Sequence, residues 1–105
     1  MKRRAQKMPV MMIMEWKGVK PEQYEAARKL VNWEGQEPAG AIFHVASFGD
    51  DSLHVTDVWE TPQDFDRFVQ ERLTPGTQKV GIQGQPAVKV FPVHATFVPH
   101  PEKLK

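Results

Sequence analysis

The sequence predicts an α+β fold in which four strands and two helices follow one another in the order βαββαβ. Three observations lead to this prediction. Apolar runs of strand length alternate with segments whose apolar residues recur every three or four positions. Gly and Pro clusters separate these segments. The composition does not change along the chain, so we expect one domain over residues 9–99, between a disordered basic tail at 1–8 and a polar tail at 100–105.

The first part of the chain predicts one strand and one helix. Residues 9–16, PVMMIMEW, form an apolar run, which the segment KGVKP interrupts. Residues 21–35, PEQYEAARKLVNWEG, place Tyr24 and further apolar side chains on one stripe. Pro21 suits the first position of a helix and Gly35 suits the position after its end. We therefore expect an amphipathic helix between these two residues.

A hairpin is predicted next, with strands at 41–48 and 53–60 joined by GDDS. If the two aspartates form the tip of the turn, the register follows by counting outward from them. It pairs Phe48 with Leu53, Ala46 with Val55, His44 with Asp57, and Ile42 with Trp59. Because side chains alternate between the two faces of a strand, these pairs share one face, which we expect to meet the helices.

The last part of the chain predicts a second helix and a fourth strand. Thr61 caps the helix in the segment TPQD, aromatic side chains then recur at helical spacing, and Pro75 with Gly76 ends the helix. The fourth strand is expected at 87–98, where Pro92 indicates an edge position or a bulge.

Together these elements predict a ferredoxin-like fold: an antiparallel sheet of order 4-1-3-2 with both helices on one face. The hairpin also carries apolar residues on its other face, among them Phe43, Val45 and Val58. Helices can cover only one face, so we expect a second copy of the chain to cover the other.

The pair His44 and Asp57 is the strongest candidate for chemistry. Opposed side chains lie about 4.5–5.5 Å apart, so the imidazole can donate a hydrogen bond to the carboxylate. One interpretation is a histidine general base oriented by an aspartate, beside the indole of Trp59. The other is a satisfied polar pair that fixes the strand register, because structural ion pairs are also common. The sequence leaves both open.

Composition excludes several other classes. The formal net charge is +1, and basic residues do not alternate with aromatic ones along the strands, so we expect no nucleic-acid partner. No apolar run reaches the length of a membrane span, and we expect no membrane partner. The chain has no cysteine, which is compatible with a cytoplasmic location and excludes thiol chemistry. The four histidines lack metal-ligand spacing, so no metal site is predicted.

Residues 55–73, VTDVWETPQDFDRFVQERL, resemble the strand-to-helix segment of the dimeric α+β barrel superfamily, especially the antibiotic-biosynthesis-monooxygenase-like proteins. The resemblance implies a homodimer whose two sheets face each other as a barrel. It also implies a pocket between the sheet and the helices of each subunit, lined by the strand tryptophan, here Trp59. Members include cofactor-independent oxygenases of polycyclic aromatics, haem-degrading enzymes and proteins with no known reaction.

Haem-degrading members of the superfamily carry a histidine after the second helix and an asparagine on the first strand. Here Gln78 lies near the first position, and the strand VMMIMEW has no asparagine. We therefore expect no cofactor. The sequence predicts His44 and Asp57 as catalytic residues, and a pocket for a small aromatic or phenolic ligand lined by Trp59, Trp33, Tyr24 and Phe65. The alternative is a ligand-binding or structural dimer without catalysis.

Overall fold

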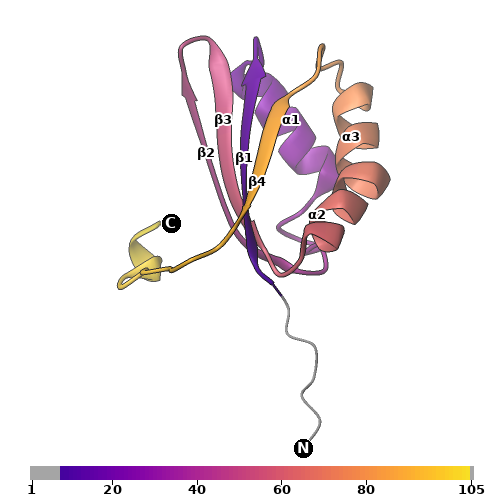
Figure 1. Cartoon of the computed structure of the whole chain (residues 1–105). Helices are drawn as coiled ribbons and strands as arrows, with labels where there is room; N and C mark the ends of the chain where they lie inside the picture. The colour runs from indigo at the N-terminus through magenta and orange to yellow at the C-terminus, as the bar shows by residue number, and fades with distance from the viewer. Residues whose placement is uncertain (1–7, 105) are drawn as a thin grey trace, which may run out of the picture.

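The computed structural model of the chain describes residues 8–104, so the predicted tail at 1–8 lies outside the described residues except for Met8, as does Lys105. Figure 1 shows a sheet with the helices on one side and a C-terminal segment that projects to the other. The elements are β1 (Val10–Lys17), α1 (Pro21–Val31), β2 (Ala41–Gly49), β3 (Ser52–Trp59), α2 (Pro62–Phe68), a π-helical turn η1 (Val69–Leu73), α3 (Thr74–Lys79), β4 (Ala87–Pro92) and a 3₁₀ turn η2 (Pro101–Leu104).

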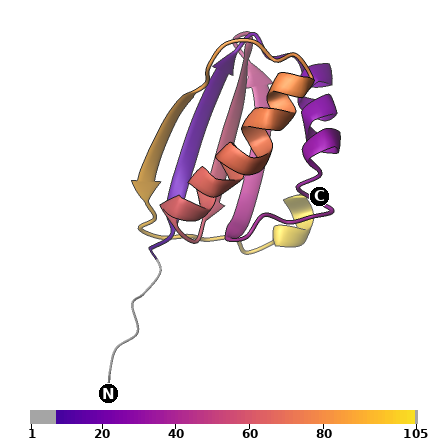
Figure 2. The ribbon, with the colours of Figure 1, turned by 90° about the vertical axis from the view of Figure 1, so that its right-hand side faces the viewer.

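The sheet has the strand order β2-β3-β1-β4, and all neighbouring strands are antiparallel. This is the predicted order, so the ferredoxin-like α+β fold is confirmed. Figure 2 shows α1 and the run from α2 to α3 lying across the same face of the sheet. The opposite face carries no α-helix in the described part of the chain.

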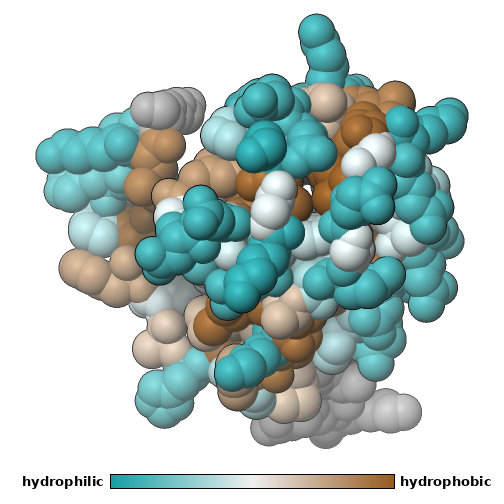
Figure 3. Space-filling view, turned by 90° about the horizontal axis from the view of Figure 1, so that it is seen from above, coloured by the Kyte–Doolittle hydropathy of each residue, from teal (hydrophilic) through white to brown (hydrophobic). Residues whose placement is uncertain are grey.

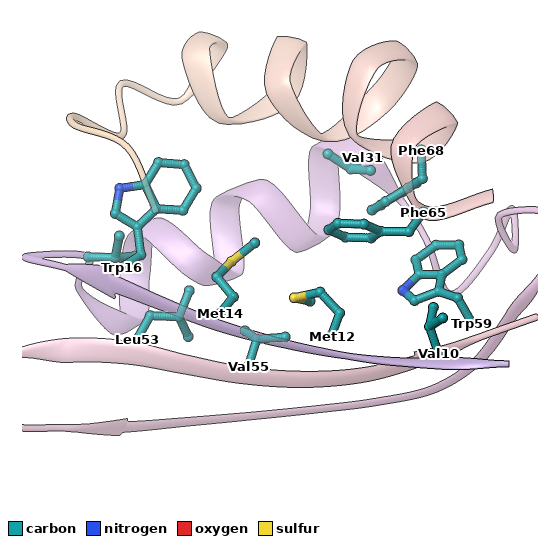
Figure 4. Packing of buried hydrophobic residues seen from close by; sticks show 11 residues of the cluster. Val10, Met12, Met14, Trp16, Val31, Leu53, Val55, Trp59, Phe65 and Phe68 are labelled. Carbon is teal, nitrogen blue, oxygen red and sulfur yellow. The ribbon is translucent and has the colours of Figure 1, made fainter. Parts of the chain in front are cut away.

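Strict alternation along the two central strands builds the core. In β1 every second residue from Val10 to Trp16 is buried, and in β3 the same holds from Leu53 to Trp59. Met12 is the most enclosed of these apolar side chains, with 1% exposure. Figure 4 shows Met12 and Met14 reaching from the sheet toward the helices, between Trp16 at one end and Trp59 at the other. The core is therefore one layer of apolar side chains between sheet and helices.

The prediction that the second helix ends at Pro75 and Gly76 is wrong. The helix continues through η1 and α3 to Lys79. Proline has no N–H to donate to the preceding turn, and the wider π-helical turn just before it lets the chain pass this point. Gly76 is buried, and a Cβ added there would collide with the side chain of Val31 on α1. Glycine at this position therefore allows α3 to pack closely against α1, and it does not end the helix.

Replacing Gly76 by Ala is expected to destabilise the protein. Alanine favours a helix over glycine by about 1 kcal/mol, but overpacking of a core costs about 1–3 kcal/mol. We expect a net loss in the free energy of unfolding, measured by urea denaturation. Gly49→Ala is the matched control, because a Cβ at Gly49 meets nothing within 4 Å. An equally stable Gly76→Ala variant would contradict the packing role.

Two predicted elements extended further along the chain than the observed ones. The first helix ends at Val31, and Asn32 adopts the left-handed conformation with φ of 59°, so the chain leaves the helix before Gly35. The fourth strand ends at Pro92 instead of reaching residue 98, because proline cannot continue the ladder as a donor. The edge position predicted from Pro92 is confirmed.

The hairpin register is confirmed from Gly49 and Ser52 outward to His44 and Asp57. Asp50 and Asp51 form the tip with φ of 52° and 57°, as a turn between two twisted strands requires. The predicted pairing of Ile42 with Trp59 is wrong. A β-bulge places Ala41 opposite Trp59, and Ile42 is the extra residue, 56% exposed.

Candidate active site

His44 and Asp57 lie side by side on β2 and β3, on the face that meets the helices. The Nδ1 atom of His44 lies 2.6 Å from Oδ1 of Asp57. The imidazole keeps 34% exposure while the carboxylate keeps 9%. A charge-assisted hydrogen bond of this length holds the ring in one orientation. The pair therefore has a buried anchor and a partly exposed imidazole.

Further hydrogen bonds connect this pair to Trp59 and Tyr24. The indole Nε1 of Trp59 donates to Oδ2 of Asp57 at 3.1 Å, so both carboxylate oxygens accept a hydrogen bond. Because the carboxylate only accepts, Nδ1 of His44 carries the proton of their bond. In the neutral ring Nε2 is then an acceptor, and the hydroxyl of Tyr24 lies 2.7 Å from it. The order of partners is thus Trp59, Asp57, His44, Tyr24.

Tyr24 is also part of an aromatic cluster. Its ring is parallel to the imidazole of His44, with centroids 6.2 Å apart, and it contacts the rings of Trp33 at 5.8 Å and Phe48 at 6.0 Å. Burial is the main cause that raises the pKa of Tyr24 to about 12; Arg28 opposes this rise and nearby carboxylates add to it. The phenol therefore stays a hydrogen-bond donor throughout the physiological range of pH.

Titration of Tyr24 can be followed directly, because it is the one tyrosine of the sequence. The pKa in the folded protein lies above the ordinary value of 10.0, so the stability linked to this group is complete below pH 10 and is lost as the pH rises toward about 12. We expect phenolate absorbance at 295 nm to rise with a midpoint near 12 in the folded protein and near 10 in denaturant. A native midpoint at 10 would contradict the partial burial of Tyr24 as the cause of the raised pKa.

A cleft of about 360 Å³ opens beside His44, at the bulged end of the hairpin. Trp59 and Phe68 lie against the core on one side, and Trp33 contacts the imidazole with ring centroids 5.4 Å apart. The cleft is lined by Trp33, Glu34, Glu37, Pro38, Ala41, Ile42, Phe43, His44, Asp57, Trp59 and Phe68. Aromatic walls with a few polar groups are typical of sites for small organic ligands.

The charged groups of the cleft are acidic. Glu34 is held by Arg28, whose Nε and Nη2 donate to the two carboxylate oxygens at 2.7 and 2.8 Å. This hydrogen bonding lowers the pKa of Glu34. Glu37 and Asp57 add two more carboxyl groups, and none of the lining residues in the described part of the chain is Lys or Arg. A neutral ligand therefore suits the cleft better than a carboxylate.

The structure brings together most of the predicted site residues. His44, Asp57, Trp59 and Trp33 all line the cleft. Phe65 does not line the cleft. It is buried at 6% exposure and packs against the indole of Trp59, with ring centroids 5.7 Å apart. Tyr24 lies on the inner side of the imidazole and lines a smaller cavity in the core.

Several residues of the cleft were not predicted. The contribution of Glu34, Glu37, Pro38 and Ile42 depends on the course of residues 32–43, which the periodicity of strands and helices does not fix. Phe68 is one of the aromatic side chains whose helical spacing predicted the second helix, and this spacing from Phe65 was the available indication.

Within residues 8–104 no three His, Cys, Asp or Glu side chains gather as a metal-binding group. In the same part of the chain no helix is long and apolar enough to cross a membrane.

No family model and no curated protein sequence matches this chain. Solved structures do. The protein NE2512 of unknown function from Nitrosomonas europaea has a TM-score of 0.64 at 13% identity, with 90% of this chain and 98% of that chain covered.

Two enzymes of Streptomyces share the same fold. SnoaB from Streptomyces nogalater, a cofactor-independent oxygenase, has a TM-score of 0.62 at 13% identity, covering 89% of this chain and 98% of its own. A monooxygenase from the gene ActVA-Orf6 of Streptomyces coelicolor, solved with nanaomycin D, has a TM-score of 0.58 at 14% identity, covering 88% and 93%. The resemblance to antibiotic-biosynthesis monooxygenases is thus confirmed for the fold: this chain has the ferredoxin-like fold of the monooxygenase-like proteins.

Proposed function

We propose that the protein is a monooxygenase-like enzyme that acts on a small neutral aromatic or phenolic compound in the cleft. The observation that carries this proposal is an imidazole that is anchored by a buried carboxylate and also borders an open aromatic cleft. A pair that only fixed strand register would not need a cleft beside it. The similarity to oxygenase structures supports the same reaction class, although the fold alone hosts many functions.

His44 is proposed to remove the proton of the substrate. Asp57 fixes the tautomer with Nδ1 protonated, which leaves the lone pair of Nε2 as the base. Tyr24 covers this lone pair in the free protein, so a substrate hydroxyl must displace the Tyr24 hydroxyl or pass its proton through it. Asp57 then stabilises the imidazolium that forms, as a carboxylate partner of a histidine base does.

Dioxygen would react with the resulting phenolate. The anion places negative charge on ring carbons, and such a carbon forms a C–O bond with dioxygen while the electrons come from the substrate. The terminal peroxide oxygen takes back the proton held by His44. Loss of water then leaves a carbonyl at the attacked carbon, so one phenol and one dioxygen give one quinone and one water.

The first test is an NMR titration of the His44 imidazole with a panel of phenols and naphthols. We expect the imidazole resonances to shift on ligand addition, and His44→Ala to abolish dioxygen-dependent quinone formation while the fold persists. Tyr24→Phe separates the two proton routes: quinone formation should persist if the substrate displaces the Tyr24 hydroxyl and fall if the proton passes through it. If no phenol moves the imidazole and His44→Ala only lowers the melting temperature, the register-fixing interpretation holds instead.

The proposal includes a homodimer formed through the sheet face opposite the helices. Across this face one row of directly paired residues runs over all four strands: Phe43, Val58, Met11 and Phe91. Every member is apolar, and Phe91 is 46% exposed. A continuous apolar row of this kind is typical of an interface. The C-terminal segment projects on this side of the sheet (Figure 1). Phe97, in that segment, is 86% exposed.

Met11→Lys should break this association. Met11 lies between Val58 and Phe91 in the apolar row, where a desolvated ammonium would have no partner. We expect light scattering to give twice the chain mass of 12.0 kDa for the wild type and a single chain mass for the variant. Leu30→Lys is the control, because Leu30 is 49% exposed on the helical layer. A wild type that stays at one chain mass at high concentration would contradict the homodimer.

A further inference from the structure

An inner chamber of about 60 Å³ lies in the core between sheet and helices. Its lining is mostly apolar and includes Met12, Ala27 and Val55. The polar atoms at its wall already have partners, since no buried side-chain N or O atom of the described residues lacks a hydrogen bond. A water molecule needs two to four polar partners to occupy a cavity, and apolar cavities stay dry and take up apolar guests such as xenon. The chamber therefore suits a small apolar molecule.

The inner chamber adjoins the catalytic pair. Four residues line both the chamber and the open cleft: Trp33, His44, Asp57 and Phe68. The imidazole thus forms part of a wall with the organic ligand site on one side and the chamber on the other. A molecule held in the chamber would lie next to the imidazole, on the side away from the open cleft.

A second cleft approaches the chamber from the opposite edge of the sheet. It has a volume of about 460 Å³ and lies between β4 and the run from α2 to α3. Six residues line both this cleft and the chamber: Met14, Trp16, Phe65, Leu73, Thr77 and Ile82. The three spaces form a row through the layer between sheet and helices. Figure 3 shows, from above, brown apolar surface visible between teal hydrophilic side chains.

We propose that dioxygen enters by the second cleft and is held in the inner chamber, while the organic substrate enters by the cleft at His44. This inference rests on the proposed oxygenase function and adds a separate route for the second substrate. Dioxygen is apolar and diatomic, so an apolar chamber of this volume concentrates it relative to water without binding the larger phenol. Flexible methionine side chains at the chamber allow such a guest to pass.

The test uses the paramagnetism of dioxygen on the whole protein labelled with ¹³C at the methionine methyl groups. Under dioxygen pressure we expect faster relaxation at Met12, which is 1% exposed, than at Met8, which is 66% exposed. If Met12 were buried and dioxygen could not enter the chamber, relaxation would be faster at Met8 than at Met12. Xenon pressure should shift the Met12 methyl resonance as well. Slower relaxation at Met12 than at Met8, with no xenon shift, would overturn the proposal.

Filling the chamber gives the second arm of the test. Ala27 lines the chamber and is 3% exposed, whereas its neighbour Ala26 on α1 is exposed. In Ala27→Leu the dioxygen effect at Met12 should fall at least about threefold, since the guest volume is occupied. Ala26→Leu should leave it unchanged. Ala27→Val replaces Ala27→Leu if the larger residue prevents folding, and equal effects in the Ala26 and Ala27 variants would contradict the assignment.

These measurements need no turnover, so they separate the two proposals. If Met12 responds to dioxygen but no phenol is oxidised, the chamber stands and the oxygenase function fails. If quinone forms while the Met12 methyl group does not respond to dioxygen, the oxygenase function is supported and the proposed route of dioxygen through the chamber is wrong. If the protein oxidises a phenol and Met12 also responds to dioxygen, Ala27→Leu should raise the KM for dioxygen and leave the KM for the phenol unchanged.

Discussion

Replacement of Met12 by Ala is expected to lower the free energy of unfolding by about 2–5 kcal/mol, as large-to-small changes in a close-packed core do. Met12 is the most enclosed apolar side chain, at 1% exposure, and it lies on the central strand β1 under the helices. Its removal would enlarge the inner chamber, and the surrounding strands and helices can collapse only in part. Urea denaturation with a two-state fit measures the change.

Met8→Ala is the control for this variant, because Met8 is 66% exposed just before β1. We expect its stability to match the wild type within about 0.5 kcal/mol. The Met12→Ala variant should also bind xenon more tightly, since its chamber is larger. A loss below about 1 kcal/mol at Met12 would show that the site collapses freely and that the layer is not closely packed.

Replacement of Asp57 by Leu is the second substitution with a large expected effect. It leaves the buried indole N–H of Trp59 without an acceptor, which costs about 1–3 kcal/mol, and it also removes the partner of His44 Nδ1. The imidazole is partly exposed and can form a hydrogen bond with water instead. Most of the loss in the free energy of unfolding is therefore expected from the unpaired indole N–H of Trp59. Phenol oxidation should disappear as well, because the histidine tautomer is no longer fixed.

A double-mutant cycle identifies the source of the destabilisation. Trp59→Phe removes the donor, so Asp57→Leu in that background no longer leaves a buried N–H unpaired. We expect the two changes together to cost less than their sum by about 1 kcal/mol or more. Additive effects would mean that the hydrogen bond from the indole contributes little and that Asp57 stabilises the fold through His44 alone.

The fold was predictable because its main features have short-range causes. Alternation in β1 and β3 fixes which face each strand buries, and Asp50 with Asp51 fixes the turn that sets the hairpin register. The proximity of His44 and Asp57 follows from these two facts alone. Their role as catalytic residues remains a prediction that the proposed titration tests.

The remaining features depend on contacts between segments far apart in the sequence. Nothing near Tyr24 indicates that its hydroxyl meets Nε2 of His44, because this depends on how α1 lies over β2. The continuation of the helix past Pro75 depends on the packing of Gly76 against Val31. The bulge at Ile42 interrupts a pattern that otherwise pairs without a break, so counting from the turn could not find it.

That bulge divides the hairpin into two parts that can vary independently. From the turn to His44 and Asp57 the register is rigid, and a length change there would separate the pair. At the bulge, the β2–β3 register shifts between Ala41 and Phe43. Ala41 and Ile42 both line the cleft. Lengthening or shortening the loop before β2 would therefore reshape the ligand site while leaving its reactive pair in place. In directed evolution this loop is the segment where new ligand specificity can be selected at least cost to the chemistry.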